Sequence, residues 1–166
     1  MATHAQRRHV VEWLDFCHHH PGALLYPPGD QRTTRDGVSW HLTEQHMEHV
    51  VNAGGYWQGD CSEFGSYALK VGGLWRWSEP GWTGSHLKLL PHHYTDGKRA
   101  RAGALVVCGL HADPNGKHEM VVYEADPHGG DPVVASHGRP GFDKLRVSEI
   151  ARGGLAGHVY LNISHL

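Results

Sequence analysis

The sequence predicts an α+β protein in which helices come first and a small antiparallel sheet follows. Before Asp96-Gly97, apolar residues recur at helical spacing between Gly and Pro stops; beyond it, short apolar runs alternate with turn dipeptides. The chain has 166 residues, no internal repeat and no low-complexity linker, and this length is typical of one domain with a substantial core. We therefore predict a single domain over 1–166, with an N-terminal helix over 1–20 and a core over 55–165.

Two helices are predicted in the first third of the chain. The first runs over 3–19 and ends at Pro21-Gly22. Its apolar face is formed by Val10, Trp13, Leu14 and Cys17. The second runs over 39–52 and ends at Gly54-Gly55.

Histidines in this region are not spaced as catalytic metal ligands. A zinc peptidase of the H-E-x-x-H or H-x-x-E-H type needs its ligands one turn apart on one helix face. The stretch HLTEQH (41–46) misses the second form by one residue. The triple histidine His18-His19-His20 lies at the end of the first helix, where it could bind a metal adventitiously. We predict no catalytic metal in this protein.

The stretch from Gly59 to Lys70 predicts a turn, a capped helix start and a helix. Asp60 is a good N-cap, and Glu63, three residues later, can reach back as in a capping box. Apolar residues then follow at i, i+3, i+4 and i+7, which predicts one buried face formed by Phe64, Tyr67, Ala68 and Val71. Cys61 occupies the first helical position, where unpaired N–H groups and the helix dipole favour the thiolate.

The cysteine spacing indicates neither a zinc knuckle nor a disulfide framework. Cys17, Cys61 and Cys108 are far apart, and the chain has no C-x-x-C pair. Reduced thiols in a cytosolic setting fit this pattern best. We interpret Cys17 and Cys108 as packing residues, which leaves Cys61 as the candidate for chemistry.

Composition argues against several classes of function. The formal net charge of −2, with histidines neutral, gives no bulk attraction to nucleic acid or to an acidic membrane. No stretch is long and apolar enough to span a membrane, and the N-terminus lacks the apolar core of a signal peptide. We therefore expect a soluble protein made inside a cell. Because the chain has 17 histidines, its surface charge should depend strongly on pH near 6.

The second half of the chain predicts strands over 102–110, 117–125, 133–137 and 157–163. The turn signal Asp113-Pro114-Asn115-Gly116 predicts a hairpin between the first two. A short helix over 85–90 precedes them. It follows an aromatic run that includes Trp82, whose tryptophans either pack in the core or line a substrate groove.

Cys61, His118 and His137 form a candidate catalytic constellation. A nucleophilic cysteine needs a base, and the base needs a third group that fixes its orientation. His118 opens one predicted strand and His137 closes the next. The two histidines can therefore lie at one edge of the sheet, provided that the N-terminus of the Cys61 helix packs against that edge.

Several short motifs, spread over roughly 20–150, carry a family resemblance. The block Asp60-Cys61-Ser62-Glu63-Phe64 is similar to the D-C-S-G-F block of NlpC-type cysteine peptidases, papain-like enzymes that cut peptidoglycan stem peptides. Gly103-Ala104-Leu105-Val106 resembles their G-D-L-V strand, and 118–123 resembles the strand of His plus apolar residues that follows. The segment VVASHG (133–138) is similar to the V-V-S-H-G segment of peptidase domains in actinobacterial phage endolysins. Tyr26 and 32–37 occupy the place of a Tyr/Arg-containing loop in such lysins.

This resemblance implies a papain-like fold, with the nucleophile helix packed on the sheet, and the activity of an endolysin-type peptidoglycan hydrolase. Cys61 would be the nucleophile, His118 the general base and later the general acid, and His137 the residue that orients His118. The Cys61 backbone N–H would help to hold the oxyanion. Tyr26, Glu63 and Trp82 are the substrate-binding candidates.

The same resemblance implies bacterial peptidoglycan as the partner, no cofactor, and a monomer that accumulates in the host bacterial cytoplasm before lysis. Two positions depart from the family pattern. Glu63 replaces the usual glycine, which puts a carboxylate near the cleft, and Ala104 replaces the usual aspartate of G-D-L-V. Neither change removes a catalytic atom.

Two alternatives remain open from the sequence. One is a CHAP-like N-acetylmuramoyl-L-alanine amidase, which would use the same Cys/His machinery at the sugar–peptide junction. The other is a non-catalytic, histidine-rich module that binds metal or the cell wall.

Overall fold

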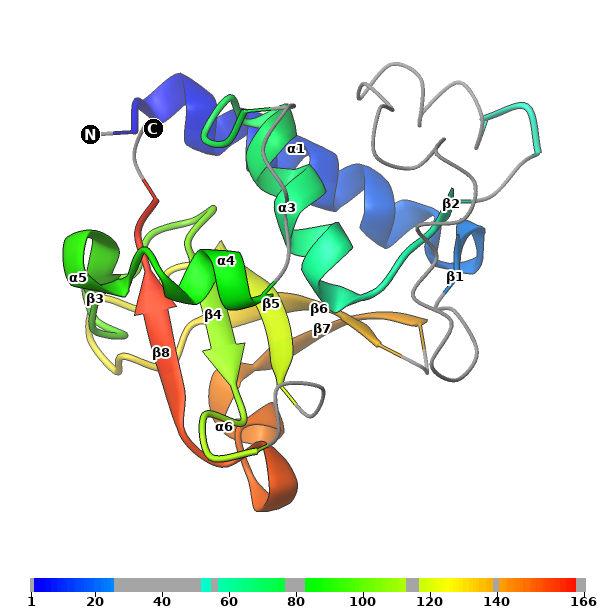
Figure 1. Ribbon diagram of the computed structural model, residues 1–166. Coiled ribbons are helices and arrows are strands. Elements are labelled where there is room, and N and C mark those ends of the chain that lie inside the picture. Colours follow the sequence, from blue (N-terminus) through cyan, green and yellow to red (C-terminus); the bar gives the residue numbers. More distant parts are fainter. Residues whose placement is uncertain are drawn as a thin grey trace.

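The computed structural model describes residues 2–25, 52–54, 57–76, 83–112, 117–138 and 141–163. Within them, the two longest helices, α1 (His4–His19) and α3 (Cys61–Val71), lie along one side of an antiparallel sheet (Figure 1). The predicted α+β class is confirmed. The predicted helix over 39–52 falls outside the described residues, apart from its last position.

Helix α1 agrees closely with its prediction. Thr3 caps its start, and the Thr3 and Gln6 side chains each bond the other's backbone N–H in a capping box. The four residues predicted for its apolar face are fully buried: Val10, Trp13, Leu14 and Cys17. The helix ends at the triple histidine, where the Nδ1–H of His19 donates to the Asp15 carbonyl oxygen at 2.7 Å. Histidines are well placed there because the carbonyl end of a helix carries partial negative charge.

Helix α3 is buried on more than its predicted face. Phe64, Tyr67 and Ala68 are buried as predicted, whereas Val71 is only partly buried. Ser62, Ser66 and Lys70 are buried as well. The Trp13 ring of α1 packs against Phe64 and Tyr67, with ring centroids 5.1 and 5.2 Å apart. Helix α3 therefore lies between α1 and the sheet as a central core element.

The sheet has six strands in the order β3-β8-β4-β5-β6-β7. All neighbours are antiparallel. The strands are β3 (Tyr94–Thr95), β4 (Leu105–Cys108), β5 (His118–Glu124), β6 (Val133–Gly138), β7 (Gly141–Arg146) and β8 (His158–Leu161). The four predicted strands correspond to β4, β5, β6 and β8, and the predicted hairpin pairing of β4 with β5 is confirmed. Strands β3 and β7 were not predicted.

Shorter elements complete the described part of the chain. The predicted helix over 85–90 is replaced by two short helices, α4 (Thr83–Leu87) and α5 (Leu90–His93). The remaining elements are a parallel pair of two-residue strands, β1 (Leu24–Leu25) and β2 (Trp57–Gln58), the helix α6 (Val147–Ile150), and 3₁₀ turns at Pro21–Ala23 and Gly153–Leu155.

Both faces of the sheet are covered, which explains why β4, a strand in its interior, is apolar along its whole length. Alternate residues of β4 belong to different cores, since successive side chains of a strand point to opposite faces. Leu105 and Val107 pack in the core with α1 and α3, whereas Val106 and Cys108 pack in a second core with Val147 of α6. Figure 1 shows α6 on the side of the sheet away from α1 and α3. In the described part of the chain, no helix has the length and apolar character needed to cross a membrane.

Candidate active site

Cys61 lies at the N-terminal end of α3, in the geometry that the sequence predicted. Asp60 Oδ1 accepts hydrogen bonds from the backbone N–H groups of Ser62 and Glu63, at 2.8 and 2.9 Å. Glu63 Oε2 accepts in return from the Asp60 N–H at 2.7 Å, which completes the predicted capping box. The Cys61 side chain is buried, with 7 % of its surface exposed. The first turn of α3 thus holds the cysteine rigidly at the positive end of the helix dipole.

His118 is the first residue of β5, and a hydrogen bond fixes its ring. Its Nε2 lies 2.8 Å from the hydroxyl oxygen of Ser136 in β6. The register explains this contact, because Met120 pairs with Ser136 and the side chains of 118, 120 and 136 therefore share one face of the sheet. Ser136 had no role in the sequence prediction.

His137 points to the opposite face and is fully buried. Its Nε2 lies 2.9 Å from the Gly59 carbonyl oxygen, and since a carbonyl only accepts, this ring nitrogen carries the hydrogen. The ring also packs against Phe64 of α3, with centroids 5.5 Å apart. His137 therefore ties β6 to the turn that precedes Cys61.

The structure brings the predicted residues to one end of the molecule. His137 holds the turn beside Cys61, and both His137 and Asp60 are close enough to His118 to influence its pKa. His137 follows Ser136 in β6, and successive residues of a strand point to opposite faces. Because Ser136 shares a face with His118, the His118 and His137 side chains lie on opposite faces of the sheet. Figure 1 shows the N-terminal end of α3 next to β6, in agreement with the Gly59–His137 bond.

Burial controls the protonation of the groups around Cys61. It lowers the pKa of His118 to about 4, an effect that the nearby His137 increases and the Asp60 charge opposes. Burial also raises the pKa of Glu63 to about 7; the hydrogen bond from the Asp60 N–H opposes this rise, and the Asp60 charge adds to it. At neutral pH His118 is therefore an uncharged base, while Glu63 titrates close to neutrality.

The other two cysteines have the packing roles predicted for them. Cys17 and Cys108 are fully buried, and burial raises the pKa of the Cys108 thiol to about 12. No disulfide joins any of the three cysteines, all of which lie in the described part of the chain. Cys61 differs from the other two in its place at a helix N-terminus.

A buried polar network lies behind α3 and was missed from the sequence. His86 Nδ1 and Glu119 Oε2 are 2.8 Å apart, and both side chains are fully buried. His86 Nε2 also lies 3.4 Å from the Ser66 hydroxyl, which donates to the Ser62 carbonyl at 2.7 Å. The network joins α4, β5 and α3 directly beneath the first turn of the helix. A glutamate inside an apolar strand was the signal that could have revealed it.

The remaining predicted residues are placed only in part. Glu63 lies in the first turn of α3, half-buried, whereas Tyr26 and Trp82 fall outside the described residues. Across the described ranges, no cluster of three or more His, Cys, Asp or Glu side chains is arranged to hold a metal ion. Comparison with protein-family models and with curated proteins found no match to this chain.

Proposed function

We propose that this protein is a cysteine peptidase of papain-like, NlpC-type fold that cleaves an amide bond in peptidoglycan stem peptides, as an endolysin does. The observation that carries the proposal is the pairing of two features at one end of the molecule. Cys61 begins a capped, buried helix, and His118 is held by Ser136 at the end of the strand beside it. The choice of peptidoglycan as substrate is supported by the motifs around these residues.

The Ser136 contact suggests which nitrogen of His118 acts as the base. With the hydrogen on Nε2, His118 donates to the Ser136 hydroxyl oxygen, and the lone pair of Nδ1 is left for the Cys61 thiol proton. The pKa of about 4 keeps the ring neutral at neutral pH, so that the Nδ1 lone pair carries no proton there. In this proposal Ser136 orients His118, and His137 holds the turn that positions Cys61.

The reaction then follows the thiol mechanism. Nδ1 of His118 takes the thiol proton, and the Cys61 sulfur attacks the amide carbonyl carbon. The Cys61 backbone N–H and the helix dipole stabilise the oxyanion. The C–N bond breaks as His118 returns the proton to the leaving amine, which leaves a thioester. Water, deprotonated by His118, attacks the thioester and releases the acid product and the thiol.

Clearing of a bacterial cell-wall suspension by wild-type protein, Cys61→Ala and Cys61→Ser, with and without EDTA, tests the proposal. We expect both variants to lose clearing while their circular dichroism is unchanged, and EDTA to have no effect. Cys108→Ala is the matched control, because it removes a buried thiol that neighbours His118 across the β4–β5 pair but does not lie at the N-terminus of α3. Clearing that survives in Cys61→Ala, or that EDTA abolishes, would contradict the thiol mechanism.

Product analysis on purified peptidoglycan separates the endopeptidase from the CHAP-like amidase, which would use the same residues. New amino termini within the stem peptide identify the endopeptidase. Free lactyl groups on muramic acid identify the amidase.

A further inference from the structure

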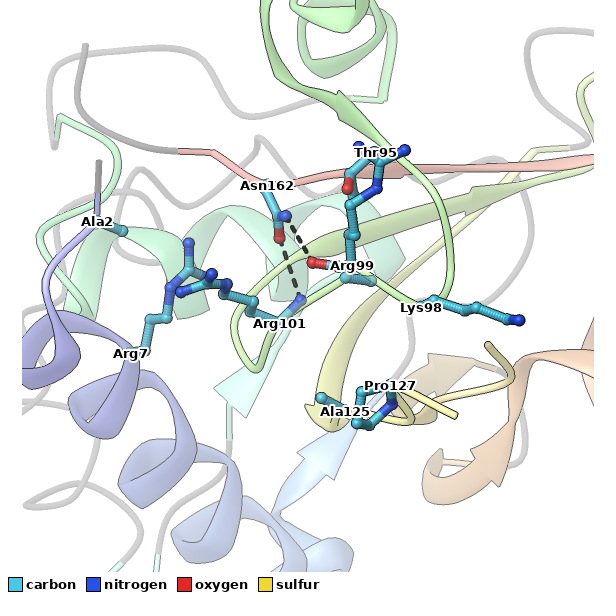
Figure 2. Close-up of a pocket in the computed structure, with 10 residues that line it drawn as sticks. Ala2, Arg7, Thr95, Lys98, Arg99, Arg101, Ala125, Pro127 and Asn162 are labelled. Atoms are coloured by element: carbon cyan, nitrogen blue, oxygen red, sulfur yellow. Dashed lines mark hydrogen bonds between the residues drawn. The ribbon is translucent and has the colours of Figure 1, made fainter. Parts of the chain in front are cut away.

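A pocket away from Cys61 has four basic residues in its lining, beside small apolar and polar residues. It has a volume of about 440 Å³, within the range of small-molecule sites. It is formed by the start of α1, the segment between β3 and β4, the turn after β5, and Asn162 after β8 (Figure 2). The Asn162 side chain accepts from the Arg101 N–H at 3.2 Å and donates to the Arg99 carbonyl at 3.0 Å, which fixes the segment that carries most of the charge.

Positive charge in this pocket exceeds the negative charge that faces it. The cationic side chains that line it are Arg7, Lys98, Arg99 and Arg101. Arg99 pairs with Asp96, at 2.7 Å. Among the residues that the structure describes, no carboxylate forms an ion pair with any of the other three.

Arg7 and Arg101 are held close together without a counter-ion from the described residues. Figure 2 shows the two side chains side by side, and burial together with the Arg101 charge lowers the pKa of Arg7. Arg7 Nη1 donates to the Ala102 carbonyl at 2.9 Å, so its guanidinium cannot swing away without losing that bond. Its Nε is buried and has no hydrogen-bond partner within the described ranges. Two adjacent guanidinium groups of this kind are favourable when an anion lies between or beside them.

The pocket is remote from the proposed active site. The first turn of α1 contacts the far end of α3, where Gln6 Nε2 donates to the Gly73 carbonyl at 3.0 Å. Cys61 is at the other end of this helix of 11 residues, which is roughly 16 Å long. A ligand in the pocket therefore does not touch the cysteine.

We propose that this pocket binds a phosphate group of a larger phosphorylated ligand. Three cations that form no ion pair with a carboxylate of the described residues match a dianion better than a single carboxylate, and guanidinium forks bind phosphate oxygens in pairs. The pocket is larger than one phosphate ion, so it has room for the rest of the ligand. This site is independent of the proposed peptidase chemistry.

Isothermal titration of the full chain with pyrophosphate, inorganic phosphate and citrate tests the assignment. We expect pyrophosphate to bind more tightly than citrate, and Arg101→Gln or Lys98→Gln to weaken its binding by about tenfold or more. Arg152→Gln is the matched control, since it removes the same charge from an exposed position outside the pocket and should leave binding unchanged. The absence of pyrophosphate binding, equal binding of citrate, or equal weakening by Arg152→Gln would overturn the proposal.

A second experiment measures how much of the protein is retained on bacterial cell walls and identifies the source of the phosphate. Only this experiment rests on the proposed function. Walls are compared before and after hydrofluoric acid removes their phosphate-containing polymers, using Cys61→Ala so that no cleavage occurs. If the ligand is a wall polymer, retention of the protein falls after this treatment. Retention of Arg101→Gln on untreated walls then falls by the same amount. Unchanged retention, together with pyrophosphate binding, identifies a soluble phosphorylated ligand.

Discussion

Ser136 shows how a single hydroxyl can set the chemistry of a neighbouring ring. The 2.8 Å contact fixes the orientation of the ring; a hydroxyl can donate or accept, and in the proposed mechanism it accepts from Nε2–H, which leaves Nδ1 for the thiol. Without it, the ring could rotate or adopt the other tautomer, and the base would face the thiol for only part of the time. Ser136 is therefore a positioning residue in the proposed mechanism.

Ser136→Ala should lower kcat by about tenfold or more while KM changes little, since the substrate does not touch this hydroxyl in the proposed mechanism. Ser148→Ala is the matched control because the Ser148 hydroxyl donates to Asp131 at 2.6 Å on the exposed surface. Steady-state kinetics on a soluble stem-peptide substrate measure both variants. An unchanged kcat in Ser136→Ala would remove Ser136 from the mechanism.

The pH dependence of His118 can be read from both activity and stability. Because its pKa is lowered to about 4, we expect the acid limb of kcat/KM near pH 4 rather than near 6.5. In the unfolded chain the ring takes up its proton near its ordinary pKa of 6.5. His118 should therefore make the folded state progressively less stable as the pH falls from about 6.5 to 4.

Chemical denaturation of wild-type protein and His118→Gln across this pH range isolates the contribution of His118. The unfolding free energy of His118→Gln has to be subtracted from that of the wild type at each pH. The reason is that the raised pKa of Glu63 makes the folded state more stable as the pH falls from about 7 to 4.5. A difference in unfolding free energy that stays constant with pH would contradict the lowered pKa of His118.

Helix α3 packs tightly on the sheet at Gly65. A side chain at Gly65 would collide with the Glu119 carboxylate, and Leu105 lies within 3.3 Å of the same position. Glu119 cannot readily move aside, because His86 holds its carboxylate in the buried network. The glycine, unfavourable in a helix interior by itself, is what lets α3 lie directly on the strand that begins with His118.

Gly65→Ala should therefore destabilise the protein although alanine favours helix. We expect the free energy of unfolding to fall by about 1–2 kcal/mol, the cost of overpacking less the gain in helix propensity. Gly154→Ala, at an exposed position with nothing within 4 Å, should change it by less than about 0.5 kcal/mol. Urea denaturation measures both, and a stabilised Gly65→Ala would show that the two elements have room to separate.

The sequence predicted those elements whose signals are local. The capping box at Asp60 and the buried face of α1 depend on residues within a few positions of one another, and both are confirmed. The partner of His118 could not be predicted, because choosing Ser136 over its neighbour requires the register of β5 against β6. Likewise, His86 and Glu119 are 33 residues apart and meet only through tertiary packing. Strand β3 has two residues, too few for a periodic pattern.

At the scale of the whole molecule, the sheet separates two cores, and α3 separates the two proposed sites. The core with α1 and α3 supports the Cys61 end, and the second core packs against α6. The basic pocket lies at the opposite end of α3, where the start of α1 meets Asn162. The two proposed sites therefore lie at opposite ends of α3.

The net charge of the molecule should reverse sign within the mildly acidic range. Its formal value is −2 with all 17 histidines neutral, and protonation of only a few of them makes it positive. His118 does not contribute there because its pKa is about 4. Electrophoretic mobility measured from about pH 7.5 to 5 should pass through zero, with a solubility minimum at the same pH. Mobility that stays negative at pH 5 would show that the fold keeps most of the histidines neutral.

The position of β8 in the sheet determines when the sheet can be completed during synthesis. This strand lies between β3 and β4, yet it is the last strand of the sheet to be synthesised. Roughly 50 residues separate β4 from β8, which at about 5–20 residues per second corresponds to a wait of about 3–10 s on the ribosome. During that interval β5 and β6 are synthesised and can pack with α3 at the Cys61 end, while β4 keeps an open edge that can pair with another chain. Strand β8 therefore covers an edge of β4 that stays open until the last strand of the sheet has been synthesised.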